Sequence, residues 1–149
     1  MSRAFWLFCA AAAGALPGWA ALGGSVESVA ADQVKFQAKR TMAAMPGYSV
    51  HEISRDDGEL IREYVTPAGK VFGVSWNGPA IPDLSQLLGS YSAEFHSTLL
   101  AQPKSFGRRP ASVHNSDLVV ETGGHMRAFQ GRAYVNSMLP AGVSAETIK

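Results

Sequence analysis

The chain has 149 residues, of which 46% are hydrophobic and 17% are charged, which suits one globular domain. It holds 13 Lys and Arg against 12 Asp and Glu, and Arg3 is the only charge in the first twenty residues, so residues 21–149 carry 12 charges of each sign. A neutral balance, with no basic run longer than Arg108-Arg109, argues against a nucleic-acid-binding protein and against a basic helix for anionic lipid.

Residues 1–20 predict a secretory signal peptide. A basic start at Arg3 is followed by an apolar run and by small residues at Gly18 and Ala20, the pattern of a peptide cleaved after Ala20. A retained membrane anchor is the alternative, because residues 4–22 carry no charge, but that stretch is barely long enough to span a bilayer. We therefore expect export to the periplasm or the extracellular space, with no stable membrane insertion after cleavage.

The single cysteine, Cys9, lies within this apolar run and would leave with it. Residues 21–149 then hold no cysteine. Disulfides, thiol nucleophiles and zinc–thiolate sites are therefore excluded for the mature chain.

Residues 21–47 predict an N-terminal arm or a short helix. Val29 to Arg40 could form that helix, with Val34 and Ala38 on one face, or could lie extended on the domain. The apolar periodicity is weak and is bracketed by Gly24 and by Pro46-Gly47, so both alternatives stay open.

The single domain is expected over residues 48–149, and it opens with three predicted strands at 48–54, 59–65 and 70–76. The strands alternate polar and apolar residues, and the turns between them read RDDG and TPAG. Connections of four residues permit only antiparallel pairing, because parallel strands need long crossovers.

An amphipathic helix is predicted at about 83–102. Asp83 can cap its first turn, and Gln86 three residues later resembles a capping box. Gly89 weakens the helix by about 1 kcal/mol relative to Ala, and we expect it to allow a close approach to the sheet. The apolar residues that recur at helical spacing are Leu84, Leu87, Leu88, Tyr91, Phe95 and Leu99.

The last third predicts four more short strands, at 111–114, 117–122, 125–129 and 132–135. Gly123-Gly124 and Gln130-Gly131 are interpreted as the turns that separate the last three strands. The tail is expected to pack through Met138, Leu139 and Val143. The resulting fold class is α+β, a curved antiparallel sheet of about six or seven short strands packed on one amphipathic helix and preceded by a cleaved signal peptide.

The candidate ligand-binding residues are His125, Arg127 and Arg132, with His114. In a strand over 125–129, His125 and Arg127 share one face and Met126 points into the core. An imidazole and two guanidinium groups on one face would suit an anion. The alternative is an ordinary solvated face, because antiparallel sheets commonly keep one face wet.

Other chemistries find little support. The four histidines show no metal-ligand spacing, and Met42 and Met45 alone do not make a soft-metal site, so neither a metal nor a cofactor is expected. Ser75 and the other serines lie outside any nucleophile elbow, so no catalytic residue is assigned and a hydrolase is the least favoured class.

The run SWNGPAIPDLSQLLG, residues 75–89, is the most distinctive local stretch. The favoured interpretation is a packed corner between strand and helix, with Trp76, Pro79 and Ile81 over it and Asp83 as the cap. An aromatic-lined groove at that corner, suited to a peptide or a glycan, is the alternative.

The segments REYVTPAG, NGPAIPDL, GGHMRAF and LPAGVSAE resemble a family of exported bacterial proteins known as domain of unknown function 2844. The resemblance extends over nearly all of residues 21–149. It implies export and a single domain, and it brings no assigned catalytic or binding residue.

Together these observations favour a non-enzymatic module of the cell envelope that binds another exported or envelope protein or serves a structural role. A periplasmic domain that binds a small anion or a metal is the alternative. The oligomeric state is left open.

Overall fold

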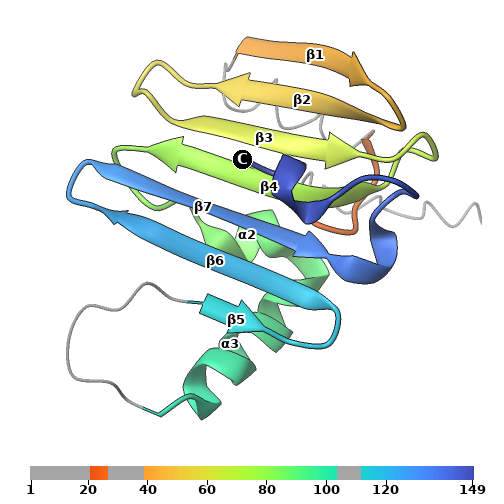
Figure 1. Cartoon of the computed structure of the whole chain (residues 1–149). Helices are drawn as coiled ribbons and strands as arrows, with labels where there is room; N and C mark the ends of the chain where they lie inside the picture. The colour runs from red at the N-terminus through yellow and green to blue at the C-terminus, as the bar shows by residue number, and fades with distance from the viewer. Residues whose placement is uncertain (1–20, 27–38, 104–111) are drawn as a thin grey trace, which may run out of the picture.

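One seven-stranded antiparallel sheet dominates the structure, a computed structural model that describes residues 21–26, 39–103 and 112–149. The predicted signal peptide lies outside these residues. The strands are β1 (Lys39–Met45), β2 (Tyr48–Ser54), β3 (Leu60–Val65), β4 (Val71–Gly78), β5 (Ser112–His114), β6 (Leu118–His125) and β7 (Ala128–Val135). Their order across the sheet is β1-β2-β3-β4-β7-β6-β5, so β1 and β5 form its two edges (Figure 1).

The antiparallel meander predicted over residues 48–76 is confirmed. β2 has the predicted bounds, and the turns close through hydrogen bonds from Gly58 N to Arg55 O and from Gly69 N to Thr66 O. Both glycines have positive φ, which such tight turns require.

One face of the sheet, here called the helical face, packs against α2 (Leu84–Leu88), the 3-10 turn η1 (Gly89–Tyr91) and α3 (Ser92–Ala101). Asp83 caps α2 as predicted, with its carboxylate accepting from Ser85 N at 2.9 Å. The six predicted apolar residues of the helix all pack in the core on this face. The core also includes Val74, Trp76, Val120 and Ala133.

The helix is interrupted at Gly89, and the expected reason for that glycine was wrong. Gly89 has a φ of +51°, and a Cβ there would lie 2.5 Å from Ala21 Cβ. The close approach is therefore to the N-terminal segment and not to the sheet. Leu22 in that segment is buried, and its backbone nitrogen donates to Leu87 O at 2.9 Å.

The opposite face of the sheet, here called the tail face, is covered by the end of the chain. The tail passes through two 3-10 turns, η2 (Asn136–Met138) and η3 (Ala145–Thr147), in front of β4 and β7 (Figure 1). Ile148 is fully buried with Phe72 and Tyr134, and Met138, Leu139 and Val143 pack around them as predicted. The sheet is therefore dry on both faces near its centre.

The sheet also begins earlier than expected. Residues 39–45 form β1, a full antiparallel partner of β2 with Met42 opposite His51. Lys39 and Arg40, the only described residues of the helix considered for Val29 to Arg40, lie in this strand; the rest of that segment is outside the described residues. No helix in the described part of the chain is long and apolar enough to cross a membrane.

Candidate functional site

The predicted turns at Gly123-Gly124 and Gln130-Gly131 are wrong. β6 and β7 form one long hairpin whose turn is Met126-Arg127, and His125 pairs with Ala128 at its tip. Arg127 has a φ of +65° and lies in this turn. His125 and Arg127 therefore do not share a strand face, and Met126, predicted to be core, is 79% exposed.

Arg132 and His114 lie elsewhere, beside Glu121 on the tail face. Arg132 Nε is 2.7 Å from one Glu121 oxygen, and His114 Nε2 is 3.5 Å from the other. Arg132 also donates to the backbone oxygen of Ala145 at 3.2 Å. Since a strand rises about 3.3 Å per residue, His125 lies roughly 13 Å along β6 from this cluster.

The four predicted site residues thus separate into two groups. Arg132 is neutralised by a carboxylate and holds the tail, while His125 and Arg127 lie exposed at the hairpin tip. The remaining histidines, His51 and His96, contact Arg40 and Ser85 respectively. Within the described ranges, no group of three His, Cys, Asp or Glu residues is placed to hold a metal ion.

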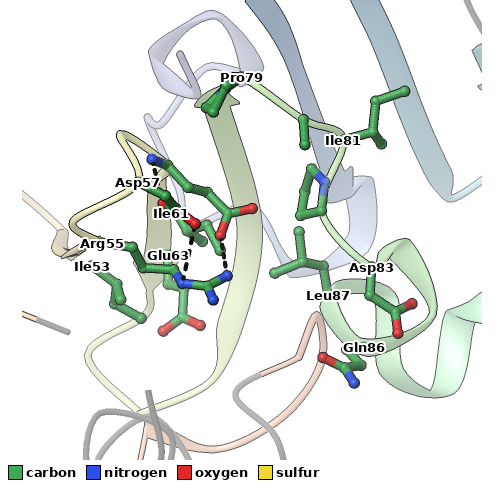
Figure 2. A pocket seen from close by; sticks show the side chains of 13 residues that line it. Ile53, Arg55, Asp57, Ile61, Glu63, Pro79, Ile81, Asp83, Gln86 and Leu87 are labelled. Carbon is green, nitrogen blue, oxygen red and sulfur yellow. Dashed lines mark hydrogen bonds and ion pairs between the residues drawn. The ribbon is translucent and has the colours of Figure 1, made fainter. Parts of the chain in front are cut away.

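A different site stands out on the helical face, where the β2–β3 turn faces the connection from β4 to α2. It is a pocket of about 290 Å³, here called the corner pocket (Figure 2). Its apolar walls are made by Ile53, Ile61, Pro79, Ala80, Ile81, Pro82 and Leu87. Ile53 and Ile61 pair directly across β2 and β3, which puts both side chains on this face.

The polar lining of the corner pocket is mostly acidic. Among the described residues it is lined by the guanidinium of Arg55 and by four carboxyl groups, those of Asp57, Glu59, Glu63 and Asp83. Glu59 and Glu63 are both buried. Among the described lining residues, carboxyl groups therefore outnumber guanidinium groups.

Arg55 and Glu59 are held together at the mouth of the turn. Arg55 Nη1 donates to Glu59 Oε2 at 2.6 Å, and Glu59 N donates to Asp57 Oδ1 at 3.0 Å (Figure 2). This hydrogen bond to Glu59 raises the pKa of Arg55 above its ordinary value, although desolvation acts in the other direction. The carboxylates of Glu59 and Asp57 are therefore held in place by the protein itself.

A glycine makes room for this arrangement. Gly78 ends β4 directly beside Glu59, and a Cβ at Gly78 would lie 3.1 Å from Glu59 Cα. The chain then leaves the sheet through Pro79 and Pro82. Their rings restrict φ and so stiffen this connection, which forms the second wall of the pocket.

The structure does have a pocket at the corner formed by residues 77–83, as the alternative interpretation predicted, but its lining residues differ from those expected. Trp76 is buried in the core of the helical face and does not line the pocket, so the walls are aliphatic and not aromatic. Pro79 and Ile81 are exposed, whereas the favoured interpretation from the sequence was that they pack over the corner. Asp57, in the predicted RDDG turn, both stabilises the turn and lines the site.

Serine and histidine pairs do occur, but away from this pocket. Ser85 Oγ is 3.4 Å from His96 Nε2, and Ser49 Oγ is 3.2 Å from His51 Nε2, and none of these four residues lines the corner pocket. The other ring nitrogen of His51 contacts Arg40, a cation, where a general base would need a carboxylate.

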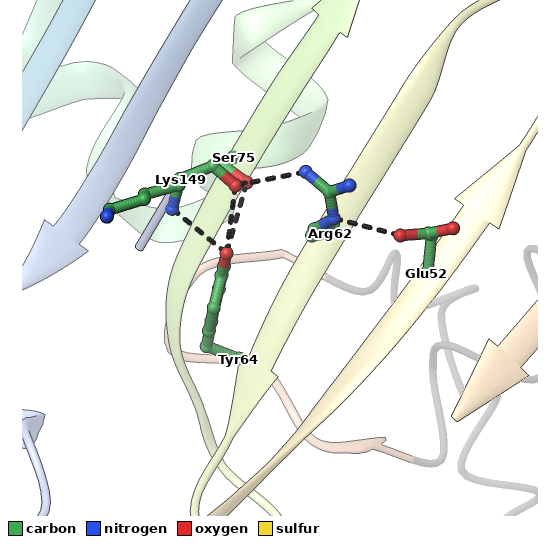
Figure 3. A network of polar contacts seen from close by, with 5 residues as sticks. All are labelled: Glu52, Arg62, Tyr64, Ser75 and Lys149. Atoms are coloured by element: carbon green, nitrogen blue, oxygen red, sulfur yellow. Dashed lines mark hydrogen bonds and ion pairs between the residues drawn. The ribbon is translucent and has the colours of Figure 1, made fainter. Parts of the chain in front are cut away.

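Ser75 has a structural partner. Its hydroxyl donates to the backbone oxygen of Lys149 at 2.7 Å, and the same oxygen accepts from Tyr64 at 3.0 Å and from Arg62 at 3.2 Å (Figure 3). Arg62 is itself paired with Glu52 at 2.9 Å. These groups fasten the tail to the central strands.

A family model described as a protein of unknown function (DUF2844) matches residues 18–148. Comparison with curated proteins and with solved structures gives no match.

Proposed function

Because the chain belongs to the DUF2844 family, whose description assigns no activity, we propose a function from geometry: a non-enzymatic binding module of the cell envelope. Its corner pocket takes a cationic side chain with an apolar stem, a Lys or Arg presented by another exported protein. The observation that carries this proposal is the combination of aliphatic walls with four carboxyl groups among the described lining residues.

The shape and chemistry of the pocket select this class of ligand. Small-molecule sites usually measure about 300 to 1,000 Å³, so a pocket at the lower limit suits one side chain better than a large cofactor. A Lys or Arg side chain packs its methylene stem on apolar surface and keeps its charged end against carboxylates. An anionic ligand would meet the same carboxyl groups and be repelled.

The signal-peptide pattern of residues 1–20 supports an envelope or extracellular location for the partner. The earlier alternative, an anion bound by His125, Arg127, Arg132 and His114, is less favoured. The two groups of residues are separated, and Arg132 already faces Glu121.

Titration of the purified chain with hexylammonium tests the proposal, since this probe has an alkyl stem and one positive charge. We expect saturable binding by calorimetry, with hexanoate and hexanol at least about tenfold weaker. Equal binding of hexanoate, or no binding of hexylammonium at millimolar concentration, would overturn the proposal.

Two variants locate the binding. Ile81→Ser removes a wall side chain that is 52% exposed, and Leu100→Ser is a matched control because Leu100 is 86% exposed and lies outside the pocket. Asp57→Asn removes one charge but keeps the oxygen that accepts from Glu59 N. Hexylammonium binding should weaken about fivefold in Ile81→Ser and in Asp57→Asn and stay unchanged in Leu100→Ser; an equal effect in all three contradicts the assignment.

A further inference from the structure

The outer edge of β1 is the strongest feature that the corner pocket does not use. Among the described residues no strand pairs with this edge, and six of the seven β1 residues are exposed. Met42 is 67% exposed and Met45 is 44% exposed. The other edge strand, β5, has only three residues, so β1 presents the longer row of backbone donors and acceptors.

We infer that β1 pairs with β1 of a second copy of this chain, antiparallel and centred on Met42. An open edge strand is a template for another strand, and natural sheets normally protect it with prolines, bulges or charges. β1 has no proline and no acidic residue, and both of its cations lie at its start, in Lys39 and Arg40. The other five residues, TMAAM, carry no charge that would oppose pairing.

The register follows from the length of the strand. β1 has seven residues, and Met42 is the fourth, so two antiparallel copies overlap fully only when Met42 lies on the two-fold axis. In that register Lys39 lies opposite Met45 of the second copy, Arg40 opposite Ala44, and Thr41 opposite Ala43.

This register has favourable chemistry. No cation lies opposite a cation, because Lys39 and Arg40 both meet uncharged residues. The exposed side chain of Met42 is covered by its own counterpart. At about 3.3 Å per residue the contact is roughly 23 Å long, which is narrow for a protein interface, so we expect a concentration-dependent dimer.

In this pairing, equivalent faces of the two sheets lie on the same side of the dimer. Facing residues in this register are separated from Met42 by the same number of positions, so their side chains point to the same face. Two sheets then join edge to edge into one, with the tail face of both copies on the same side.

A cysteine crosslink tests the register directly. In a Cys9→Ser background, Met42→Cys places two thiols opposite each other, where facing Cα atoms of antiparallel strands are about 4.5 to 5.5 Å apart and within reach of a disulfide. Ala43→Cys is the matched control. Its counterpart lies diagonally across the axis at about 7 to 8 Å, beyond the usual disulfide limit.

Under mild oxidation we expect a covalent dimer from Met42→Cys and little from Ala43→Cys. Met126→Cys, also at an exposed methionine but on the hairpin tip, controls for chance collision. Equal crosslinking of all three variants, or none in any, overturns the inference.

Charge substitutions without cysteine give an independent measurement. By sedimentation, Met42→Glu should weaken the dimer about tenfold, because it places two carboxylates face to face. Met45→Glu should strengthen it about fivefold, because each new carboxylate meets Lys39 of the other copy. A protein that is monomeric at all concentrations, or equal effects of the two substitutions, refutes self-pairing; binding of hexylammonium in the corner pocket is unaffected by either outcome.

Discussion

Replacing Gly131 by alanine should destabilise the fold, although the sequence suggested a turn at this position. Gly131 lies in β7 directly opposite Trp76 of β4, on the helical face. A Cβ at Gly131 would lie 2.6 Å from Glu121 O and would overlap the Trp76 ring. The nearest ring atom, Trp76 Cζ2, would be 2.2 Å away, and ordinary contacts begin near 3.4 Å, so both neighbours must move by roughly an ångström.

Neither neighbour can move easily. Trp76 is buried in the core, and Glu121 O belongs to the backbone of β6, which is paired with β7 on either side of this position. Forcing an extra methyl into a packed site costs about 1 to 3 kcal/mol, with backbone shifts at the upper end. Alanine also lowers the conformational entropy of the unfolded chain, and this effect stabilises the fold by less than about 1 kcal/mol. We therefore expect a loss of about 2 kcal/mol, or a Tm lower by roughly 7 °C.

Gly123→Ala is the matched control in the same hairpin. A Cβ at Gly123 meets no atom within 4 Å, and its φ is not positive, so the substitution should be neutral or stabilising by about 0.4 to 1 kcal/mol. Urea unfolding followed by tryptophan fluorescence measures both, because Trp76 is the single tryptophan of residues 21–149. Gly131→Ala within about 0.5 kcal/mol of the parent chain, or both variants equally unstable, would show that the reasoning from contact with Trp76 is wrong.

Two further predictions concern the hairpin tip and the first two strands. Arg127→Gly should stabilise the chain by about 1 kcal/mol in the same unfolding assay, because it removes a non-glycine residue from a φ of +65°, and a loss of stability would contradict the role of Arg127 as a turn residue. The pKa of His51 is lowered from its usual 6.5 by burial and by the nearby Arg40 guanidinium. The unfolded chain therefore binds a proton more readily, so stability should fall as pH drops below 6.5 towards the folded-state pKa. His51→Gln should lose less stability than the parent between pH 7.5 and 5.5, and identical pH profiles would refute this.

The central strands were predictable because local and tertiary preferences agree there. Tyr48 to Ser54 alternates, carries β-branched residues and ends at a turn sequence, and it forms β2 with those bounds. β1 was missed because alanine and methionine favour helices, and only its pairing with β2 makes residues 39–45 extended. Strand propensity is weak evidence when the deciding interaction comes from another part of the chain.

Glycines were the second source of error. The sequence predicts a turn at Gly131, but the absence of a side chain there is what allows Trp76 to pack. The turn in the structure holds Arg127 in a conformation that non-glycine residues seldom adopt. Because Met126-Arg127 contains no glycine, asparagine or aspartate, the sequence gives no indication of a turn there. For the same reason the sequence predicts a strand over residues 125–129, where the structure has the tip of the hairpin.

The corner pocket was half predictable. One wall, residues 79–83, stood out from its prolines and its helix cap, whereas the opposite wall requires the pairing of Ile53 with Ile61 and the fold of the 55–59 turn. Local sequence can identify one side of a site, but the distance to the other side is a property of the tertiary structure.

The tail has a consequence for how the protein reaches its native state. Ile148 covers Phe72, and Lys149 is fastened to Tyr64 and Ser75, residues more than seventy positions earlier in the chain. During synthesis from the N-terminus, one face at the centre of the sheet stays exposed to solvent until Ile148 has been made. Burial of this face depends on contacts between distant segments, and we expect it to be a slow, late step that follows the synthesis of Ile148 and Lys149.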